Sequence, residues 1–191
     1  MMPTVLATPR HALALTAMLV LLAACAEDSA TSPARPGSDP TATASAARVA
    51  TPGDTNAVLA QLRRVTARYH VLDTALAEGF VLLHECENRP GEGPVGTVYV
   101  HLGRLLDGAI DPEMPDALVY EPQPNGALAL VGAEFAIPYA MWPAATPPTF
   151  MGATFQREDE FGVFALHAWV WRPNPSGMFA ETNPRVSCGD A

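Results

Sequence analysis

The sequence predicts an α+β fold in which one long N-terminal amphipathic helix packs on a mainly antiparallel β-sheet. Two observations predict this class. An apolar stripe with helical spacing follows residue 50, and short apolar segments separated by turns occupy most of the remaining chain. Because the helix comes first and the strands follow together, an antiparallel sheet is favoured over alternating βαβ units. We expect residues 51–191 to form a single α+β domain.

The predicted helix begins at Thr51 and Pro52 and ends before Gly79. Thr51 offers a capping side chain, and Pro52 suits the first helical position. The apolar residues that follow are separated by steps of 4, 3, 4, 3 and 4, and they are Val58, Leu62, Val65, Tyr69, Leu72 and Leu76. Gly79 supplies a C-terminal stop. The pattern therefore predicts one continuous core-facing helix of about 24 residues.

Five segments after the helix have the composition of β-strands, and they are residues 80–83, 97–102, 117–121, 127–137 and 161–172. Residues 85–96 are acidic and rich in Gly and Pro, which predicts a loop. Pro143, Pro147 and Pro148 predict another loop between the last two strands. From Pro173 onward, two Asn-Pro pairs predict that the C-terminal segment forms proline-rich turns on the surface.

The N-terminal region has the pattern of a bacterial export signal. Arg10 precedes an apolar run over residues 12–24, which is shorter than the roughly 20 residues that a membrane span needs. The run ends in the sequence LAAC, which resembles a lipobox with Cys25 as the lipidated, mature N-terminus. We therefore expect residues 1–24 to be a signal peptide, and residues 25–50 to be a lipidated cysteine with a disordered, polar tether. The predicted location is exported and anchored to a bacterial membrane, in the periplasm or on the cell surface.

Charge and cysteine content narrow the possibilities further. The formal net charge of −9 argues against nucleic-acid binding, which needs a basic surface. With Cys25 lipidated, Cys86 and Cys188 remain, and in an oxidising compartment we expect them to form a disulfide. The alternative is a thiolate metal site that combines Cys86 with His84.

Several short motifs resemble those of an uncharacterised family of secreted bacterial lipoproteins. They are LVYEP over 118–122, LHAWVW over 166–171, NPSGMF over 174–179 and NPRVSC over 183–188. The resemblance covers roughly residues 66–188. Where the family usually has His-Tyr-Val-Asn, this chain has His-Leu-Gly-Arg from His101 onward. Because the family has no established activity, the resemblance implies a domain type and an exported location only.

Strand geometry groups the candidate ligand-binding residues. Residues two apart in a strand share a face, so Tyr99 and His101 point the same way, as do His167, Trp169 and Trp171. Histidines flanked by large aromatic side chains are typical of the wall of a small-molecule site. The sequence therefore predicts a ligand site that includes Tyr99, Trp169 and Trp171.

The same region offers candidate metal ligands. If the two strands are neighbours, His101 and His167 converge, and Glu134 is the natural third member. Two histidines and one carboxylate are the ligand set of a zinc or non-haem iron site, and methionines elsewhere in the domain would favour copper. His84 is a candidate fourth ligand. The alternative is that each histidine is hydrogen-bonded in or beside the core, and that Glu134 pairs with an arginine such as Arg172.

No catalytic signature is visible. The sequence HECEN over 84–88 lacks the second histidine of the zinc-protease motif, and no Gly-x-Ser-x-Gly elbow is present. Hence no catalytic residue is predicted, and an enzyme is not favoured. The preferred hypothesis is a lipid-anchored module that binds a metal or a small ligand. The alternatives are a metal-dependent hydrolase or oxygenase that uses the same residues, and a structural or interaction lipoprotein without a small-molecule site. The membrane, reached through the lipid, is the predicted partner.

Overall fold

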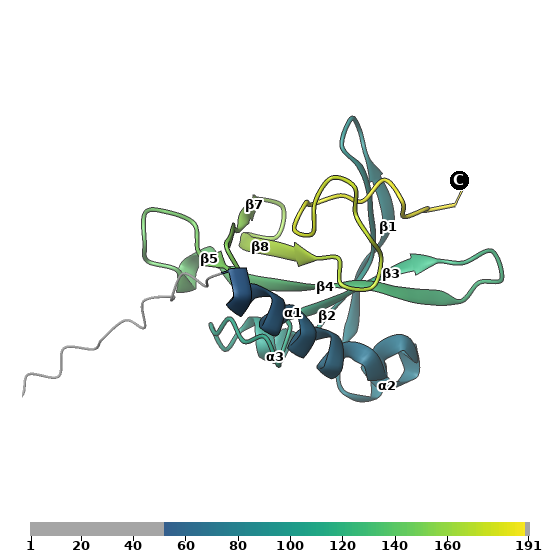
Figure 1. The fold of residues 1–191 in the computed structure, drawn as a ribbon, viewed down its shortest axis with the longest axis horizontal. Helices are drawn as coiled ribbons and strands as arrows, with labels where there is room; N and C mark the ends of the chain where they lie inside the picture. The colour runs from purple at the N-terminus through teal and green to yellow at the C-terminus, as the bar shows by residue number, and fades with distance from the viewer. Residues whose placement is uncertain (1–51, 190–191) are drawn as a thin grey trace, which may run out of the picture. The chain divides into compact units, whose positions relative to one another are not determined.

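The computed structural model describes residues 52–189, which adopt the predicted α+β fold (Figure 1). The fold consists mainly of the helix α1 (Pro52–Thr66) and a six-stranded antiparallel sheet of order β1-β2-β3-β4-β8-β7. The sheet curls into a half-barrel. The predicted signal peptide, the lipidation site Cys25 and the tether lie outside the described residues. Within residues 52–189, no helix has both the length and the apolar character needed to cross a membrane.

The predicted continuous helix is interrupted in the structure. After α1 the chain forms a 3₁₀ turn, η1 (Ala67–His70), and a short helix, α2 (Leu72–Ala77), with the extended residue Val71 between them. The carbonyl of Tyr69 accepts a hydrogen bond of 2.8 Å from the hydroxyl of Tyr120, so it is satisfied outside the helix. The apolar stripe thus specifies a buried face, but this tertiary contact ends the regular winding, and Leu76 at the end of the stripe is exposed.

The sheet is built from five longer strands and one short edge strand: β1 (Val81–Arg89), β2 (Gly93–Val100), β3 (Ala117–Pro122), β4 (Leu128–Pro138), β8 (Val163–Ala168) and β7 (Gln156–Glu158). The connections contain α3 (Leu102–Leu105), η2 (Tyr139–Met141) and a small sheet of β5 (Thr149–Phe150) and β6 (Ala153–Thr154). The predicted strands near 97–102, 117–121 and 127–137 are confirmed. The strand predicted over 161–172 is shorter, because the chain turns after Ala168, where Val170 N–H donates to the Ala168 carbonyl at 2.8 Å.

The predicted loop over residues 85–96 is wrong, because this segment is most of a β-hairpin. β1 and β2 pair from Val81 opposite Val100 to Arg89 opposite Gly93. As an edge strand, β1 carries polar side chains and three irregularities in its register, so its sequence lacks the alternation that identifies a half-buried strand.

Each face of the sheet packs against a different part of the chain. One face carries the larger core, in which Leu59 and Leu62 of α1 meet Leu118, Phe135 and Leu166 of the strands. On the other face a second core contains Val95, Val119, Trp169 and Val186. Val186 belongs to the C-terminal turns, and the next residues are joined to β1 by the disulfide between Cys86 and Cys188. The predicted disulfide is confirmed.

Candidate functional site

The two edge strands of the sheet approach each other through their side chains. The Arg89 guanidinium of β1 donates to the Glu158 carboxylate of β7, with N–O distances of 3.4 and 3.2 Å. Near this contact the ring of His84 stacks on Phe161, with ring centroids 6.1 Å apart. Because β1 and β7 are the first and last strands in the sheet order, these contacts bridge the opening of the half-barrel.

A cavity of about 190 Å³ lies inside this curl. Its walls are mainly apolar and are formed by Val95, Val100, Leu105, Ala117, Ala136 and Val163. Leu83, Leu102 and Phe161 also line the cavity and are exposed, so they mark its mouth. Two buried polar side chains, His167 and Glu134, form its floor. We call this cavity the His167–Glu134 pocket.

His167 and Glu134 lie side by side because their strands pair. Glu134 of β4 is directly opposite His167 of β8 in the antiparallel register. His167 Nε2 is 3.4 Å from Glu134 Oε2, but the orientation does not form a hydrogen bond, and Nε2 has no hydrogen-bond partner among the described residues. The two residues are 5% and 9% exposed, respectively. The floor of the pocket therefore presents a buried, unpartnered ring nitrogen beside a carboxyl group.

The ring of His167 is held in place from behind. Trp169 stacks on it with ring centroids 5.8 Å apart and nearly parallel planes. The Trp169 indole N–H donates to the Ala180 carbonyl at 2.6 Å, which fixes the indole against the C-terminal turns. Trp169 thus positions the imidazole and does not itself line the pocket.

Burial changes the protonation of both floor residues. Desolvation raises the pKa of Glu134 to about 7, and the nearby charge of Glu158 adds to the rise. Desolvation also lowers the pKa of His167 to about 4. Near neutral pH His167 is therefore uncharged and Glu134 is partly ionised. Although the two side chains are close, they are not an ion pair of opposite full charges.

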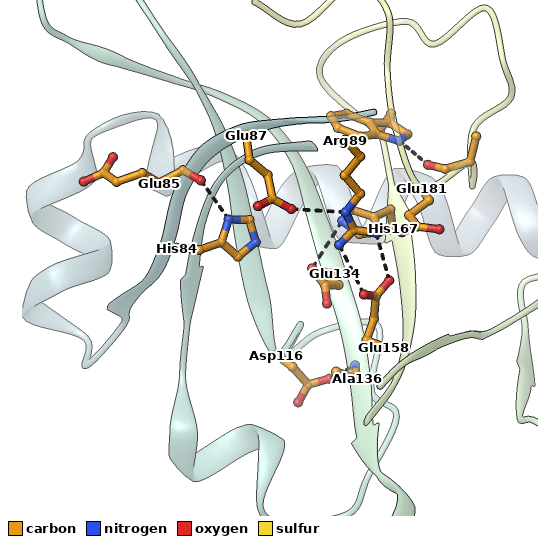
Figure 2. A network of polar contacts seen from close by, with 12 residues as sticks. His84, Glu85, Glu87, Arg89, Asp116, Glu134, Ala136, Glu158, His167 and Glu181 are labelled. Atoms are coloured by element: carbon orange, nitrogen blue, oxygen red, sulfur yellow. Dashed lines mark hydrogen bonds and ion pairs between the residues drawn. The ribbon is translucent and has the colours of Figure 1, made fainter. Parts of the chain in front are cut away.

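A second buried carboxyl group lies just outside the pocket. Asp116 accepts a hydrogen bond of 2.8 Å from the backbone N–H of Ala136, and burial raises its pKa to about 7 (Figure 2). Its backbone N–H donates to the Glu134 carbonyl at 3.0 Å. The nearby charges of Asp107 and Glu134 also raise the pKa of Asp116.

Arg89, which also lines the pocket, is surrounded by carboxylates. Besides Glu158, its guanidinium contacts Glu87 at 3.1 Å and also Glu181 (Figure 2). The three partners come from β1, from β7 and from the C-terminal turns. The guanidinium therefore ties three segments together, and its donors face carboxylates of the protein.

The structure brings together some of the predicted site residues and separates others. His167, Glu134 and His84 line one pocket. Tyr99 and His101 lie on the opposite face of the sheet. The prediction that His101 and His167 converge is therefore wrong. Strands β3 and β4 separate β2 from β8 in the sheet, and residue parity directs the two histidines to different faces.

The predicted site residues Tyr99, His101 and Trp171 lie on the face of the sheet that packs against α1, and each contacts neighbouring residues there. The His101 ring packs edge-on against Phe80, with ring centroids 5.3 Å apart, and its Nδ1 accepts the backbone N–H of Arg104 at 3.2 Å. Tyr99 packs against Tyr120 in the same way, at 5.6 Å. The Trp171 indole N–H donates to Thr66 Oγ1 at 3.1 Å. Trp171 is separated from Trp169 because the chain turns after β8.

The predicted metal site does not fit the donor geometry. Among residues 52–189, no group of three or more His, Cys, Asp or Glu side chains is arranged to hold a metal ion. His84 lines the pocket, but its Nδ1–H donates to the Glu85 carbonyl at 2.8 Å. The alternative ion pair of Glu134 with Arg172 is also absent, since Arg172 contacts Glu121 at 3.0 Å.

Sequence reasoning missed Arg89 and Glu158 as members of the site. Arg89 lies in the segment predicted to be a loop, and Glu158 begins an acidic run that resembles a solvated turn. The two are 69 residues apart, and they meet only because the sheet curls. No local pattern in the sequence reports this contact.

Comparison with known proteins adds no homologue. No protein-family model, curated protein or solved structure matches this chain.

The pocket itself combines an apolar wall, a mouth open between apolar side chains, and two buried polar groups that point inward. This combination is suited to holding a small molecule by its apolar surface and orienting it through one polar group.

Proposed function

We propose that this chain is an exported, lipid-anchored protein that binds a small, mainly apolar ligand in the His167–Glu134 pocket. The observation that carries the proposal is the unpartnered Nε2 of His167 at the floor of an apolar cavity. Buried polar atoms are nearly always hydrogen-bonded in folded proteins, because an unmade bond costs about 1–3 kcal/mol. A polar group on a ligand would supply the missing partner.

The size of the pocket limits the ligand. Its volume of about 190 Å³ is somewhat larger than an apolar cavity of about 150 Å³ that holds one benzene molecule. It is smaller than the 300–1,000 Å³ typical of sites for drug-sized molecules. The ligand is therefore of the size of one aromatic ring, or a short aliphatic chain, with a single polar head.

The proposed location rests on sequence and on the disulfide. The LAAC sequence ending at Cys25 resembles a lipobox, and the motifs over 118–188 resemble those of secreted bacterial lipoproteins. The disulfide between Cys86 and Cys188 supports an oxidising compartment, since such bonds are rare in the bacterial cytosol. Lipidation at Cys25 would keep the binding domain beside a membrane.

The pocket favours ligand binding over the other hypotheses. A metal-dependent hydrolase or oxygenase would need a third metal ligand beside His167 and Glu134, which the described residues do not place there. No Ser, Thr or Cys side chain lies among the described lining residues, so the pocket offers no hydroxyl or thiol nucleophile. A purely structural lipoprotein would have no need of an unpartnered histidine nitrogen in a cavity.

Titration of the full chain with 2-phenylethanol tests this proposal. We expect saturable binding by calorimetry, and we expect Ala136→Leu to abolish it, because Ala136 lines the pocket and a larger side chain would fill the cavity. Ala127→Leu, at an exposed position in the turn before β4, makes the same chemical change elsewhere and should leave binding unchanged. Ala117→Leu is a second pocket-filling variant in case the first does not fold. Failure of every ring-sized probe to bind, or binding that survives both pocket-filling changes, would contradict the proposal.

A further inference from the structure

The charges around the His167–Glu134 pocket exclude one class of ligand. Glu134 and Glu158 both line the pocket, and Arg89 is the arginine that lines it. Arg89 already contacts Glu87, Glu158 and Glu181, so three carboxylates share one guanidinium. An anionic ligand would meet an excess of negative charge and no free cationic donor. The ligand head is therefore neutral or positive.

The floor of the pocket needs hydrogen-bond donors and not acceptors. An ionised carboxylate only accepts, and no hydrogen-bond donor to the Glu134 carboxyl is found among the described residues. His167 is uncharged near neutral pH, and in the tautomer that carries its proton on Nδ1 the buried, unpartnered Nε2 is an acceptor. The two atoms, His167 Nε2 and Glu134 Oε2, lie 3.4 Å apart, close enough for one head group to reach both.

We infer that the ligand carries a protonated primary amine, which donates one N–H to the Glu134 carboxylate and another to His167 Nε2. This inference rests on the proposed function, because it names the head group of the ligand in the same pocket. An ammonium group supplies several donors and one positive charge, and Glu134 lacks a cation in direct contact among the described residues. A hydroxyl head has a single donor and no charge, so it cannot donate to both floor atoms and also compensate the carboxylate.

The apolar part of the ligand compensates for the loss of water around the ammonium. Moving a charge out of water is costly unless it is paired, and Glu134 is the pairing group. The walls of Val95, Val100 and Val163 and the mouth residues Leu102 and Phe161 remove the ring or chain of the ligand from water. The ligand class is thus a small primary amine with an apolar body of about the size of one aromatic ring.

Three probes with the same ring and different head groups test the inference: 2-phenylethylamine, 2-phenylethanol and phenylacetate. Calorimetric titration of the full chain near pH 8 should give a Kd for the amine about tenfold or more below that of the alcohol, because the hydrogen bonds to the amine are charge-assisted. Phenylacetate should bind more weakly than either.

Glu134→Gln should remove the preference of the wild-type chain for the amine over the alcohol, since glutamine keeps the shape of the side chain and carries no charge. Glu160→Gln, at an exposed position in the turn between β7 and β8, is the matched control and should change neither Kd. If the alcohol or phenylacetate binds as tightly as the amine to the wild-type chain, the inference is overturned while the proposed function stands. If none of the three probes binds, both fall.

Discussion

Replacing Glu134 by Gln should stabilise the folded chain near pH 8 and leave its stability nearly unchanged near pH 4. The carboxyl group is buried, and burial raises its pKa from 4.5 to about 7. Between these two pH values the unfolded chain releases a proton that the folded chain retains. The free energy of unfolding of the wild-type chain therefore falls as the pH rises through this interval.

The magnitude follows from the size of the pKa change. Each unit of pKa corresponds to about 1.36 kcal/mol, so a rise from 4.5 to about 7 amounts to about 3 kcal/mol. Glutamine carries no titratable proton and avoids this loss. His167 has the opposite effect on the free energy of unfolding. Its pKa falls from 6.5 to about 4 on folding, so between these pH values the unfolded chain binds a proton that the folded chain does not, and stability rises with pH. This contribution is common to both proteins and cancels in the comparison.

Urea unfolding with the disulfide intact measures the difference. We expect Glu134→Gln to exceed the wild-type stability by about 3 kcal/mol near pH 8, with the gain disappearing toward pH 4, where the carboxyl group is protonated in both states. Glu160→Gln, with an exposed side chain, should show no such dependence on pH. A gain of the same size at both pH values, or a loss near pH 8, would refute the argument that Glu134 is buried without a compensating cation.

Other changes probe the contacts that shape the site. Arg89→Met should lower the free energy of unfolding by about 2 kcal/mol in urea, because it leaves Glu158 and its neighbours without their shared cation; a second change, Glu158→Gln, should recover part of the loss. Tyr120→Phe should cost about 1–3 kcal/mol by thermal unfolding, because the Tyr69 carbonyl loses its donor, and an unchanged Tm would show that this bond does not matter. Reduction of the disulfide, whose cysteines are 102 residues apart, should cost about 4 to 5 kcal/mol, and an unchanged urea midpoint in reductant would contradict this.

Local patterns predict the fold class and much of its secondary structure. The apolar stripe from Val58 onward gives a helix with the correct buried face, and apolar runs such as 127–137 give strands close to those observed. The disulfide follows from the predicted compartment and from the cysteine count. The helix and strand predictions rest on the preferences of a few neighbouring residues, and the disulfide prediction rests on the cysteine content of the whole chain. None of these predictions depends on which strands are neighbours.

The site depends on information that no local pattern carries. His101 and His167 both lie in or beside strands and both neighbour aromatic residues, but two strands separate them, and the pairing register places them on opposite faces of the sheet. Arg89 and Glu158 form the bridge across the half-barrel only because its edge strands curl toward each other. Glu134 is the exception. An acidic residue inside an apolar strand indicates a buried carboxyl group even before its partner is known.

Titration of the isotope-labelled full chain with 2-phenylethylamine, followed through its imidazole NMR signals, tests ligand binding in the His167–Glu134 pocket most directly. We expect the ring nitrogen signals of His167 to shift and saturate with the ligand, because Nε2 gains a hydrogen-bond donor. The signals of His101, which lies on the opposite face and has its own partner, should stay in place. Binding without a change at His167, or an equal change at both histidines, would contradict the proposed site.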